Sequence, residues 1–273
     1  MDETQGLKSK VLWYLLVLFF ILPFLFPLIW ILMASFKTQA QIVAMPPVWI
    51  FPPTLENYQK VFVEQEFGRF LLNSSIIAVG STLLSLIIGL PAAYTISRYK
   101  QRILGVFILL ARLMPGISYL IPWFILFSKL HLVDTYTSLI ASHMLVGMPL
   151  IVWIMINYFD ALPRELEEAA QVDGCTLQGA FFRVVLPLSG PGILTASTLA
   201  FLFSWNNFMF ALVLSAEHTK TLPIAIYSFV SYAEVSWGSV MAAAVVIIAP
   251  AIVLTMIFQR YVIKGLTMGA VKG

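Results

Sequence analysis

The chain contains six long runs that carry almost no charge. A helix needs roughly 20 apolar residues to cross the hydrocarbon core of a bilayer. Runs of that length lie at 11–36, 70–97, 103–127, 135–159, 188–216 and 235–259. A helix satisfies its own backbone hydrogen bonds in lipid, and these runs lack the short alternating pattern of a membrane barrel. The sequence therefore predicts an all-α integral membrane protein with six transmembrane helices, in a single transmembrane domain over residues 1–273.

The composition excludes several other classes of protein. Only 11% of the residues are charged and 60% are hydrophobic, whereas a soluble domain carries about 25% charged residues. The net charge is +3 without a basic block, so nucleic acid is not an expected partner. Three widely separated histidines do not form a metal site, and one cysteine cannot form a disulfide within the chain.

The lysines and arginines predict the orientation in the membrane. With six spans, both termini share one side with the loops near 98–102 and 160–187. That side carries ten lysines and arginines, the other side carries five, and Arg112 falls inside a span. Because cytoplasmic loops are enriched in these residues, both termini and the 160–187 loop are expected in the cytoplasm of a multi-pass cell-membrane protein.

The 160–187 loop is acidic and has the pattern of two short helices joined by a tight turn. Pro163 suits a first helical turn, with three glutamates following near the positive end of the helix dipole. Gly174 can end that helix, since glycine tolerates a left-handed conformation. Thr176 can cap a second helix, which Pro187 is expected to close.

The same loop resembles the EAA loop of ABC-importer permeases. Glu168-Ala169-Ala170, then Gly174, and then Val184, Leu186 and Pro187 match that pattern at the right spacing, with Val184 in place of Ile. Other stretches are similar to the smaller, maltose-type subunit of carbohydrate importers: PPTLENY (52–58), AAYTISRY (92–99), FSWNNFMFAL (203–212) and GLTMGAVKG (265–273). The resemblance covers nearly the whole chain.

The resemblance implies a type I ABC-importer permease fold, with the EAA loop docked as a coupling helix on a separate ATPase subunit. The residues that it implicates are Glu168, Ala169, Ala170, Gly174, Val184, Leu186 and Pro187. We expect Asp173, beside Gly174, to join Glu168 in polar or ionic contacts with the ATPase. Because the chain has no G-x-x-x-x-G-K-[S/T] loop, ATP hydrolysis is expected on that other subunit. This chain is thus not expected to be an enzyme or to bind a cofactor, with ATP and Mg²⁺ held by the ATPase. The alternative is an amphipathic surface hairpin without a partner.

Polar residues inside spans are candidates for a solute pathway. They are Arg112, Tyr119, Trp205, Asn206 and Asn207. Arg112 precedes Met114-Pro115-Gly116, where the helix is expected to break; it either lines the cavity, or snorkels or pairs with a partner subunit. An aromatic ring and two amides suit a polyol, although asparagines also form hydrogen bonds between membrane helices.

An outer loop near 217–234 contains Tyr227, Phe229 and Tyr232. It resembles the segment that enters the open cleft of a substrate-binding protein in some relatives. The alternative is an aromatic belt at the membrane interface. The 265–273 tail is either a second contact with the ATPase or a frayed terminus.

Together these features predict the membrane subunit of an ATP-driven carbohydrate importer. Its expected partners are a second homologous permease, two ATPase subunits and an external sugar-binding protein, which is expected to select the sugar. Three alternatives remain: an ABC importer of a non-sugar solute, a self-contained secondary transporter, and a membrane scaffold that transports nothing.

Overall fold

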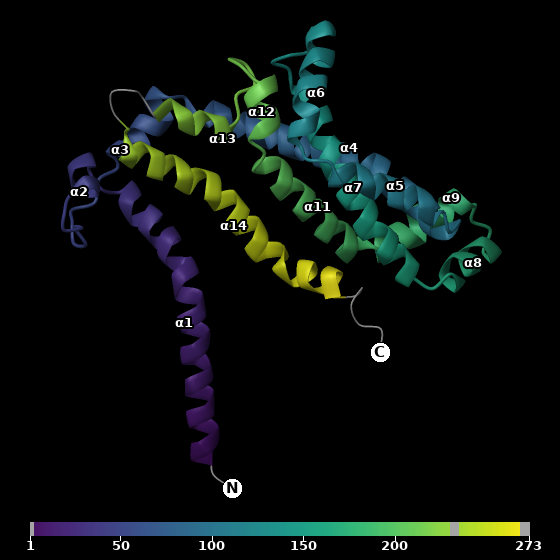
Figure 1. Ribbon diagram of the computed structural model, residues 1–273. Helices are drawn as coiled ribbons and strands as arrows, with labels where there is room; N and C mark the ends of the chain where they lie inside the picture. The colour runs from purple at the N-terminus through teal and green to yellow at the C-terminus, as the bar shows by residue number, and fades with distance from the viewer. Residues whose placement is uncertain (1–2, 230–234, 268–273) are drawn as a thin grey trace. The chain divides into compact units, whose positions relative to one another are not determined.

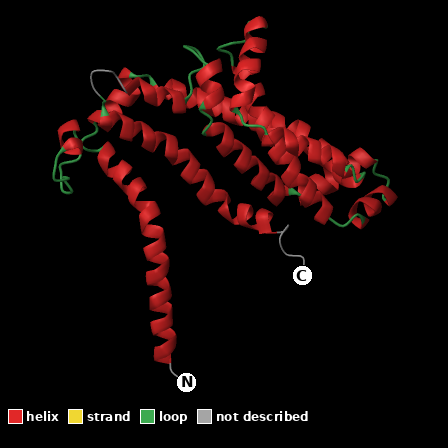
Figure 2. Ribbon diagram, in the orientation of Figure 1, coloured by secondary structure: helices red, strands yellow, loops and turns green. Residues whose placement is uncertain are grey.

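The computed structural model describes the backbone of residues 3–229 and 235–267, and the side chains of these residues except 3–9, 11, 112, 228 and 260–267. All the regular elements in these ranges are helices (Figures 1 and 2). The all-α class predicted from the sequence is therefore confirmed for the described part of the chain.

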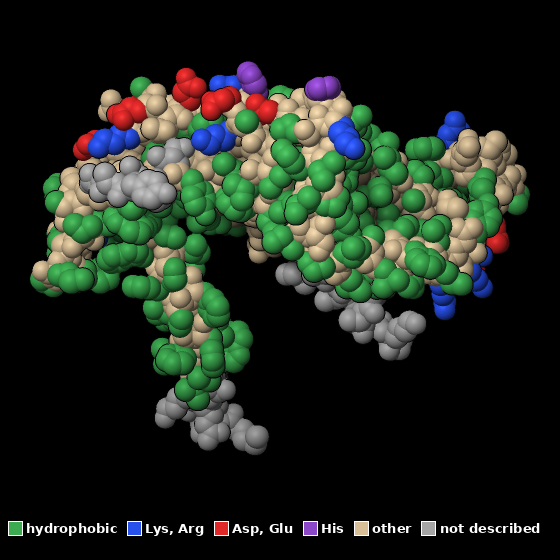
Figure 3. Space-filling view, turned by 45° about the horizontal axis from the view of Figure 1, so that its top comes forward, with side chains coloured by type: hydrophobic (Ala, Val, Ile, Leu, Met, Phe, Trp, Pro, Cys, Tyr) green, Lys and Arg blue, Asp and Glu red, His purple; other side chains and the backbone are tan. Residues whose placement is uncertain are grey.

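Four of the six predicted runs form continuous helices that are long and apolar enough to cross a membrane. They are α1 (Glu3–Ser35), α4 (Phe67–Arg98), α7 (Tyr136–Ala161) and α14 (Trp237–Thr267). From Leu12 onward, the exposed side chains of α1 are almost all hydrophobic, as Figure 3 shows. Water is a poor solvent for such a surface, which suits a helix surrounded by lipid or by another membrane chain.

The third run is broken into two short helices, α5 (Arg102–Leu113) and α6 (Ile117–Lys129). Met114 adopts an extended conformation, ψ 132°, because the residue before a proline is disfavoured in the helical region. The break expected at Met114-Pro115-Gly116 is confirmed. The single helix predicted over 103–127 is not observed, because α6 turns away from the line of α5 (Figure 1).

The fifth run is also interrupted, and the sequence did not predict this break. The helix α11 (Gly190–Trp205) stops at Asn206, and α12 (Met209–Leu214) begins three residues after that. At its other end, α11 meets the segment Leu177–Leu188 at a bend of 75°. By length and composition, the described residues contain four possible spans, or five if this bent pair counts as one.

The chain divides into two compact units. One consists of Met1–Phe67 and Ile226–Ala249, and the other of Gly68–Ala225 and Pro250–Gly273, so that α14 continues from the first into the second. The first unit also holds α2 (Gln39–Val43), α3 (Glu56–Gln59) and the short turns η1 (Lys60–Glu64) and η3 (Ile226–Phe229). The second also holds α13 (Leu222–Ala225).

A buried lysine organises the segment that follows α1 in the first unit. Lys37 is 1% exposed; its Nζ donates to the Val48 carbonyl at 2.6 Å. The same ammonium group lies 4.6 Å from the centre of the Trp30 ring and 4.9 Å from that of Phe51. Cation–π contacts and one carbonyl therefore replace water around this charge. Charge counting treats Lys37 as an ordinary loop lysine and does not reveal this role.

The core of the second unit lies between α4, α7 and α11. It is built from aliphatic and small side chains, among them Leu90, Ala93, Val152, Met155, Ala196 and Ala200. A polar trio lies within the same three helices: His143 Nδ1 and Ser204 Oγ are 2.7 Å apart, and Ser81 Oγ donates to Ser204 Oγ at 3.0 Å. Lipid tails are as apolar as the helix surfaces, so apolar burial alone does not hold membrane helices together. Hydrogen bonds of this kind between helices help to do so.

A carboxylate clamp orders the loop after α12. Burial by itself raises the pKa of Asp134. Hydrogen bonds from the His218 N–H, the Thr219 hydroxyl and the N–H groups of Ala216 and Thr219 outweigh that effect and lower the pKa below its ordinary value of 3.8. The clamp therefore favours the charged carboxylate.

The clamp predicts how this loop responds to acid. Because the folded-state pKa is lowered, the stabilisation is complete above the ordinary value of 3.8 and is lost as the pH falls through the folded-state pKa. We expect the amides of Ala216, His218 and Thr219 to stay protected from hydrogen exchange between about pH 5 and pH 8. Asp134→Asn should reduce that protection at neutral pH. Loss of protection in the wild type near pH 5 would contradict the clamp.

Candidate functional site

The segment between α7 and α11 is a helical hairpin, as the sequence predicted. The first arm is α8 (Glu165–Val172). The second arm runs through α9 (Leu177–Ala180), the π-helical turn η2 (Phe181–Val185) and α10 (Leu186–Leu188). Pro163 lies two residues before α8 rather than in its first turn. Pro187 does not close the second arm, since helical structure continues through it to Leu188.

Gly174 makes the turn between the arms. Its φ is +90°, a region that side-chain-bearing residues rarely adopt. The N–H of Cys175 donates to the Ala170 carbonyl and the N–H of Gly174 to that of Gln171, which is the Schellman ending of an α-helix. Thr176 then caps the second arm, its Oγ1 accepting the N–H of Gly179 at 3.1 Å. The predicted helix end and cap are confirmed.

The residues expected to contact an ATPase do not all lie on the surface. Those exposed are Glu168, Ala169, Asp173, Gly174 and Pro187, whereas Val184 and Leu186 are half-buried and Ala170 is 8% exposed. Exposed apolar side chains accompany the exposed set, namely Leu166, Val172, Leu177 and Phe182. The hairpin thus presents an apolar surface with acidic side chains on it, a composition suited to a protein partner.

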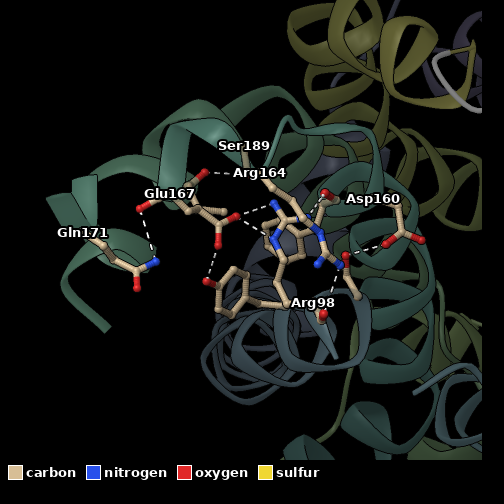
Figure 4. Close-up of polar contacts among 10 residues, drawn as sticks. Arg98, Asp160, Arg164, Glu167, Gln171 and Ser189 are labelled. Carbon is tan, nitrogen blue, oxygen red and sulfur yellow. Dashed lines mark hydrogen bonds and ion pairs between the residues drawn. The ribbon is translucent and has the colours of Figure 1, made fainter. Parts of the chain in front are cut away.

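A buried ion pair lies near the start of α8. Glu167 forms a salt bridge with Arg98, the last residue of α4; the two side chains are 8% and 10% exposed. Arg98 Nε donates to Glu167 Oε1 at 2.6 Å, and the Tyr94 hydroxyl donates to Oε2, also at 2.6 Å. Figure 4 shows the arrangement. Both carboxylate oxygens are therefore held, each by a donor from α4.

Further hydrogen bonds connect this pair to the end of α7. Arg98 Nη1 donates to the Phe159 carbonyl at 2.7 Å, and Ser97 Oγ donates to Asp160 Oδ1 at 2.5 Å. Arg164, just before α8, donates to the Arg98 carbonyl at 3.0 Å. The ends of α4 and α7 and the start of α8 thus form one polar cluster (Figure 4).

Sequence reasoning missed Glu167, which it interpreted only as one of three acids near the helix dipole. The partner residues were present in the stretch AAYTISRY, which contains Tyr94 and Arg98. No rule of spacing connects residues 69 positions apart. A buried pair of this separation becomes visible only in three dimensions.

At the break between α5 and α6, one pathway candidate forms a hydrogen bond with the backbone. The Tyr119 hydroxyl donates to the Ala111 carbonyl at 2.8 Å, joining α6 to the last turn of α5. This carbonyl has no partner further along its own helix, because the helix ends there. Arg112 belongs to α5, but its side chain lies outside the described residues.

The other three candidates lie at the end of α11 and in the break that follows it. Asn206 Nδ2 donates to the Leu202 carbonyl at 2.9 Å, and Asn207 Oδ1 accepts the N–H of Phe210 at 3.1 Å. Trp205 is 3% exposed and stacks on Phe201, so its ring faces the protein interior. Both asparagines border an open hollow of about 610 Å³, lined otherwise by Leu150, Leu199, Leu202, Phe203, Phe208 and Met209. The hollow combines an apolar wall with two amides.

The aromatic residues of the outer loop lie in different environments. Tyr227 is 61% exposed. Phe229 is buried, with its ring centre 6.0 Å from that of Phe67. Tyr232 and the end of the tail, residues 268–273, lie outside the described residues.

Comparison with known proteins gives consistent matches in sequence. Residues 85–268 match the family described as binding-protein-dependent transport system inner membrane component. The chain is 36% identical to the probable ABC transporter permease protein y4oR of Sinorhizobium fredii, over 99% of both chains. It is 39% identical to the sulfoquinovosyl glycerol transport system permease protein SmoH of Agrobacterium fabrum, over 91% of this chain and 89% of that one. It is 38% identical to the trehalose/maltose transport system permease protein MalG of Thermococcus litoralis, over 91% and 92%.

The fold has also been observed experimentally. A chain in the crystal structure of a bacterial ABC transporter involved in the import of the acidic polysaccharide alginate superposes with a TM-score of 0.78. That match covers 96% of this chain and 98% of the other, at 23% identity. At this identity the likeness concerns the fold alone.

Proposed function

The chain belongs to the family of binding-protein-dependent transport system inner membrane components, and we propose on this basis that it is the membrane-spanning permease subunit of an ATP-driven sugar importer. The observation that carries the proposal is its 38–39% identity, over nine-tenths of its length, to permeases named for trehalose/maltose and sulfoquinovosyl glycerol transport. The exposed hairpin between α7 and α11 supplies the contact through which another subunit can act.

We further propose six membrane crossings within one permease domain of residues 1–273. Four are the long apolar helices. In this proposal α5 with α6, and α11 with α12, form the other two as broken crossings. Non-helical backbone is tolerated in a membrane where it lines a cavity or lies inside protein. Six crossings, together with the excess of lysine and arginine on one side, support cytoplasmic termini and a cytoplasmic hairpin.

In the proposed complex the hairpin docks on one of two ATPase subunits, which bind ATP and Mg²⁺. Glu168 and Asp173 are exposed and negatively charged, which suits polar or ionic contacts. Ala169 lets the partner approach the backbone closely, and Gly174 holds the turn. A second permease completes the pathway, and an external binding protein delivers the sugar, with exposed Tyr227 as the candidate contact in the outer loop.

The proposal is tested with the complete importer in proteoliposomes. First, the cognate binding protein is titrated with trehalose, maltose and non-sugar solutes by calorimetry. Uptake of the sugar it binds should then require ATP on the ATPase side and the binding protein on the other. Uptake by this chain without an ATPase would instead identify a secondary transporter, and a binding protein that takes only amino acids or peptides would overturn the sugar assignment.

We place the sugar pathway of this subunit at the hollow beside Asn206 and Asn207. The apolar wall suits sugar ring faces, and amides donate to and accept from hydroxyls. In this proposal Trp205 and Tyr119 stabilise the two breaks through contacts with the protein and do not contact the sugar. Arg112 remains a candidate lining residue near the first break.

The hollow gives a direct prediction for one of its amides. Replacing Asn206 with leucine removes hydrogen-bonding groups, and we expect the apparent affinity for the transported sugar to fall about tenfold, which corresponds to one lost hydrogen bond. Met209→Leu, an apolar exchange in the same lining, is the matched control and should leave uptake unchanged. Equal uptake by both variants would remove Asn206 from the pathway.

A further inference from the structure

The two arms of the hairpin are attached to the second unit in different ways. In the second arm, Phe181 and Val185 are buried in the core with Tyr94 and Phe159. The ring centres of Phe181 and Tyr94 are 4.7 Å apart. The first arm, α8, packs on α9 and η2, its partners within the hairpin. Its link to α4 is polar and runs through Glu167.

The geometry of this link makes it stiff. Arg98 Nε and Nη2 both contact Glu167 Oε1, and the Tyr94 hydroxyl holds Oε2, so the carboxylate is fixed at both oxygens. Arg98 is itself fixed by the Phe159 carbonyl. The guanidinium group also lies 5.7 Å from the centre of the Tyr94 ring. A nearly water-free ion pair is screened little by salt and does not exchange readily with solvent contacts.

We propose that the Arg98–Glu167 ion pair carries the displacement of α8 to the end of α4, so that the two helices move as one body when the ATPase moves the hairpin. This inference rests on the proposed function, because it requires an ATPase on the hairpin. It gives Glu167 a role different from that of the adjacent Glu168: Glu168 faces outward to the partner, and Glu167 faces inward to α4. Arg98 and Glu167 are thus positioning residues.

The test must separate this role from a purely structural one. A single Arg98→Gln or Glu167→Gln change leaves one buried charge without its partner, which is destabilising in either case. The double variant has no unpaired charge and keeps side chains that can hydrogen bond. Its melting temperature should return close to that of the wild type, while the stiff link is absent.

The readout is a distance within the assembled complex, measured by pulsed electron spin resonance. One label is attached to Cys175, the only cysteine of the chain, and the other to a cysteine at Gln101, which follows α4. The probe is ATP with Mg²⁺ and vanadate, so no sugar is needed. In the wild type the distance should not change when nucleotide is added. In the double variant it should shift beyond the width of the wild-type distribution.

A second label pair distinguishes the two ways to fail. Cys175 paired with a cysteine at Leu130, after α6, reports whether nucleotide moves the hairpin at all; no change there in the wild type contradicts the proposed function. If that pair responds and the double variant still keeps the Cys175–Gln101 distance, the inference is overturned. Glu56→Gln removes an exposed ion pair with Lys60 and serves as the control that should behave as the wild type.

Discussion

Replacing Gly174 with valine is expected to abolish sugar uptake while the chain still assembles in the membrane. The φ of +90° at this residue is strained for any side chain and worst for a β-branched one, at a cost of about 1–3 kcal/mol. No atom lies within 4 Å of the position where a Cβ would be added, so the fold has room for valine and the strain falls on the turn. The Schellman ending of α8 would be lost, and the exposed acids would no longer be presented in one geometry.

The measurement is uptake per ATP hydrolysed in proteoliposomes, with membrane assembly followed by copurification of the ATPase subunits. Gly68→Val is the matched control, because that glycine also has open space around it but no positive φ. Gly174→Asn should retain more activity than Gly174→Val, since asparagine tolerates positive φ better. Wild-type uptake by the valine variant would show that the turn geometry is not needed for coupling.

The second large effect is expected at Gly192, where α11 crosses α7. A Cβ at this position would lie 2.7 Å from Cγ of Tyr158, and Tyr158 is itself only 8% exposed. Neither helix can yield without disturbing the core. We expect Gly192→Val to destabilise the second unit by about 3 kcal/mol, the upper end of the usual range for overpacking, and to reduce the amount of assembled complex.

Gly190→Ala provides the control two residues earlier in the same helix, where no atom lies within 4 Å of the added carbon. Thermal unfolding of the purified complex, followed by size-exclusion chromatography, compares the two variants. A smaller side chain at residue 158, as in Tyr158→Ala, should partly restore assembly of Gly192→Val. Equal stability of the two glycine variants would mean that α7 and α11 are not in close contact at Gly192 and Tyr158 in the membrane.

Much of the fold could be predicted from hydropathy because the membrane imposes a length on every crossing. The apolar parts of α1, α4, α7 and α14 follow the predicted runs closely, although α1 begins earlier and α14 ends later than predicted. The break at Pro115 was predictable because proline lacks an N–H and restricts the residue before it. The break after Trp205 was not, since asparagine interrupts a helix only when its side chain finds backbone partners, as Asn207 does at Phe210.

Some features of the candidate site could likewise be predicted from the sequence, and others could not. The turn at Gly174 and the cap at Thr176 depend on neighbours in the sequence, and the pattern of residues predicted both. The orientation of each acid depends on α4, 69 residues away, so sequence reasoning did not separate the inward Glu167 from the outward Glu168. The burial of Lys37 was likewise not predictable, because the aromatic rings around it come from residues before and after it in the sequence.

The breaks after α5 and α11 affect how wide a range of solutes such a subunit can transport. With 12 and 16 residues, α5 and α11 are about 18 and 24 Å long, shorter than the roughly 30 Å hydrocarbon layer. In the proposed topology their peptide dipoles end within the membrane, and the main-chain carbonyls and amides that a helix interior would pair lie at each break. Main-chain groups are the same whatever the side chains are. In the proposed importer, such a pathway would order hydroxyl groups without recognising one particular sugar, and discrimination between sugars would fall to the binding protein that delivers them.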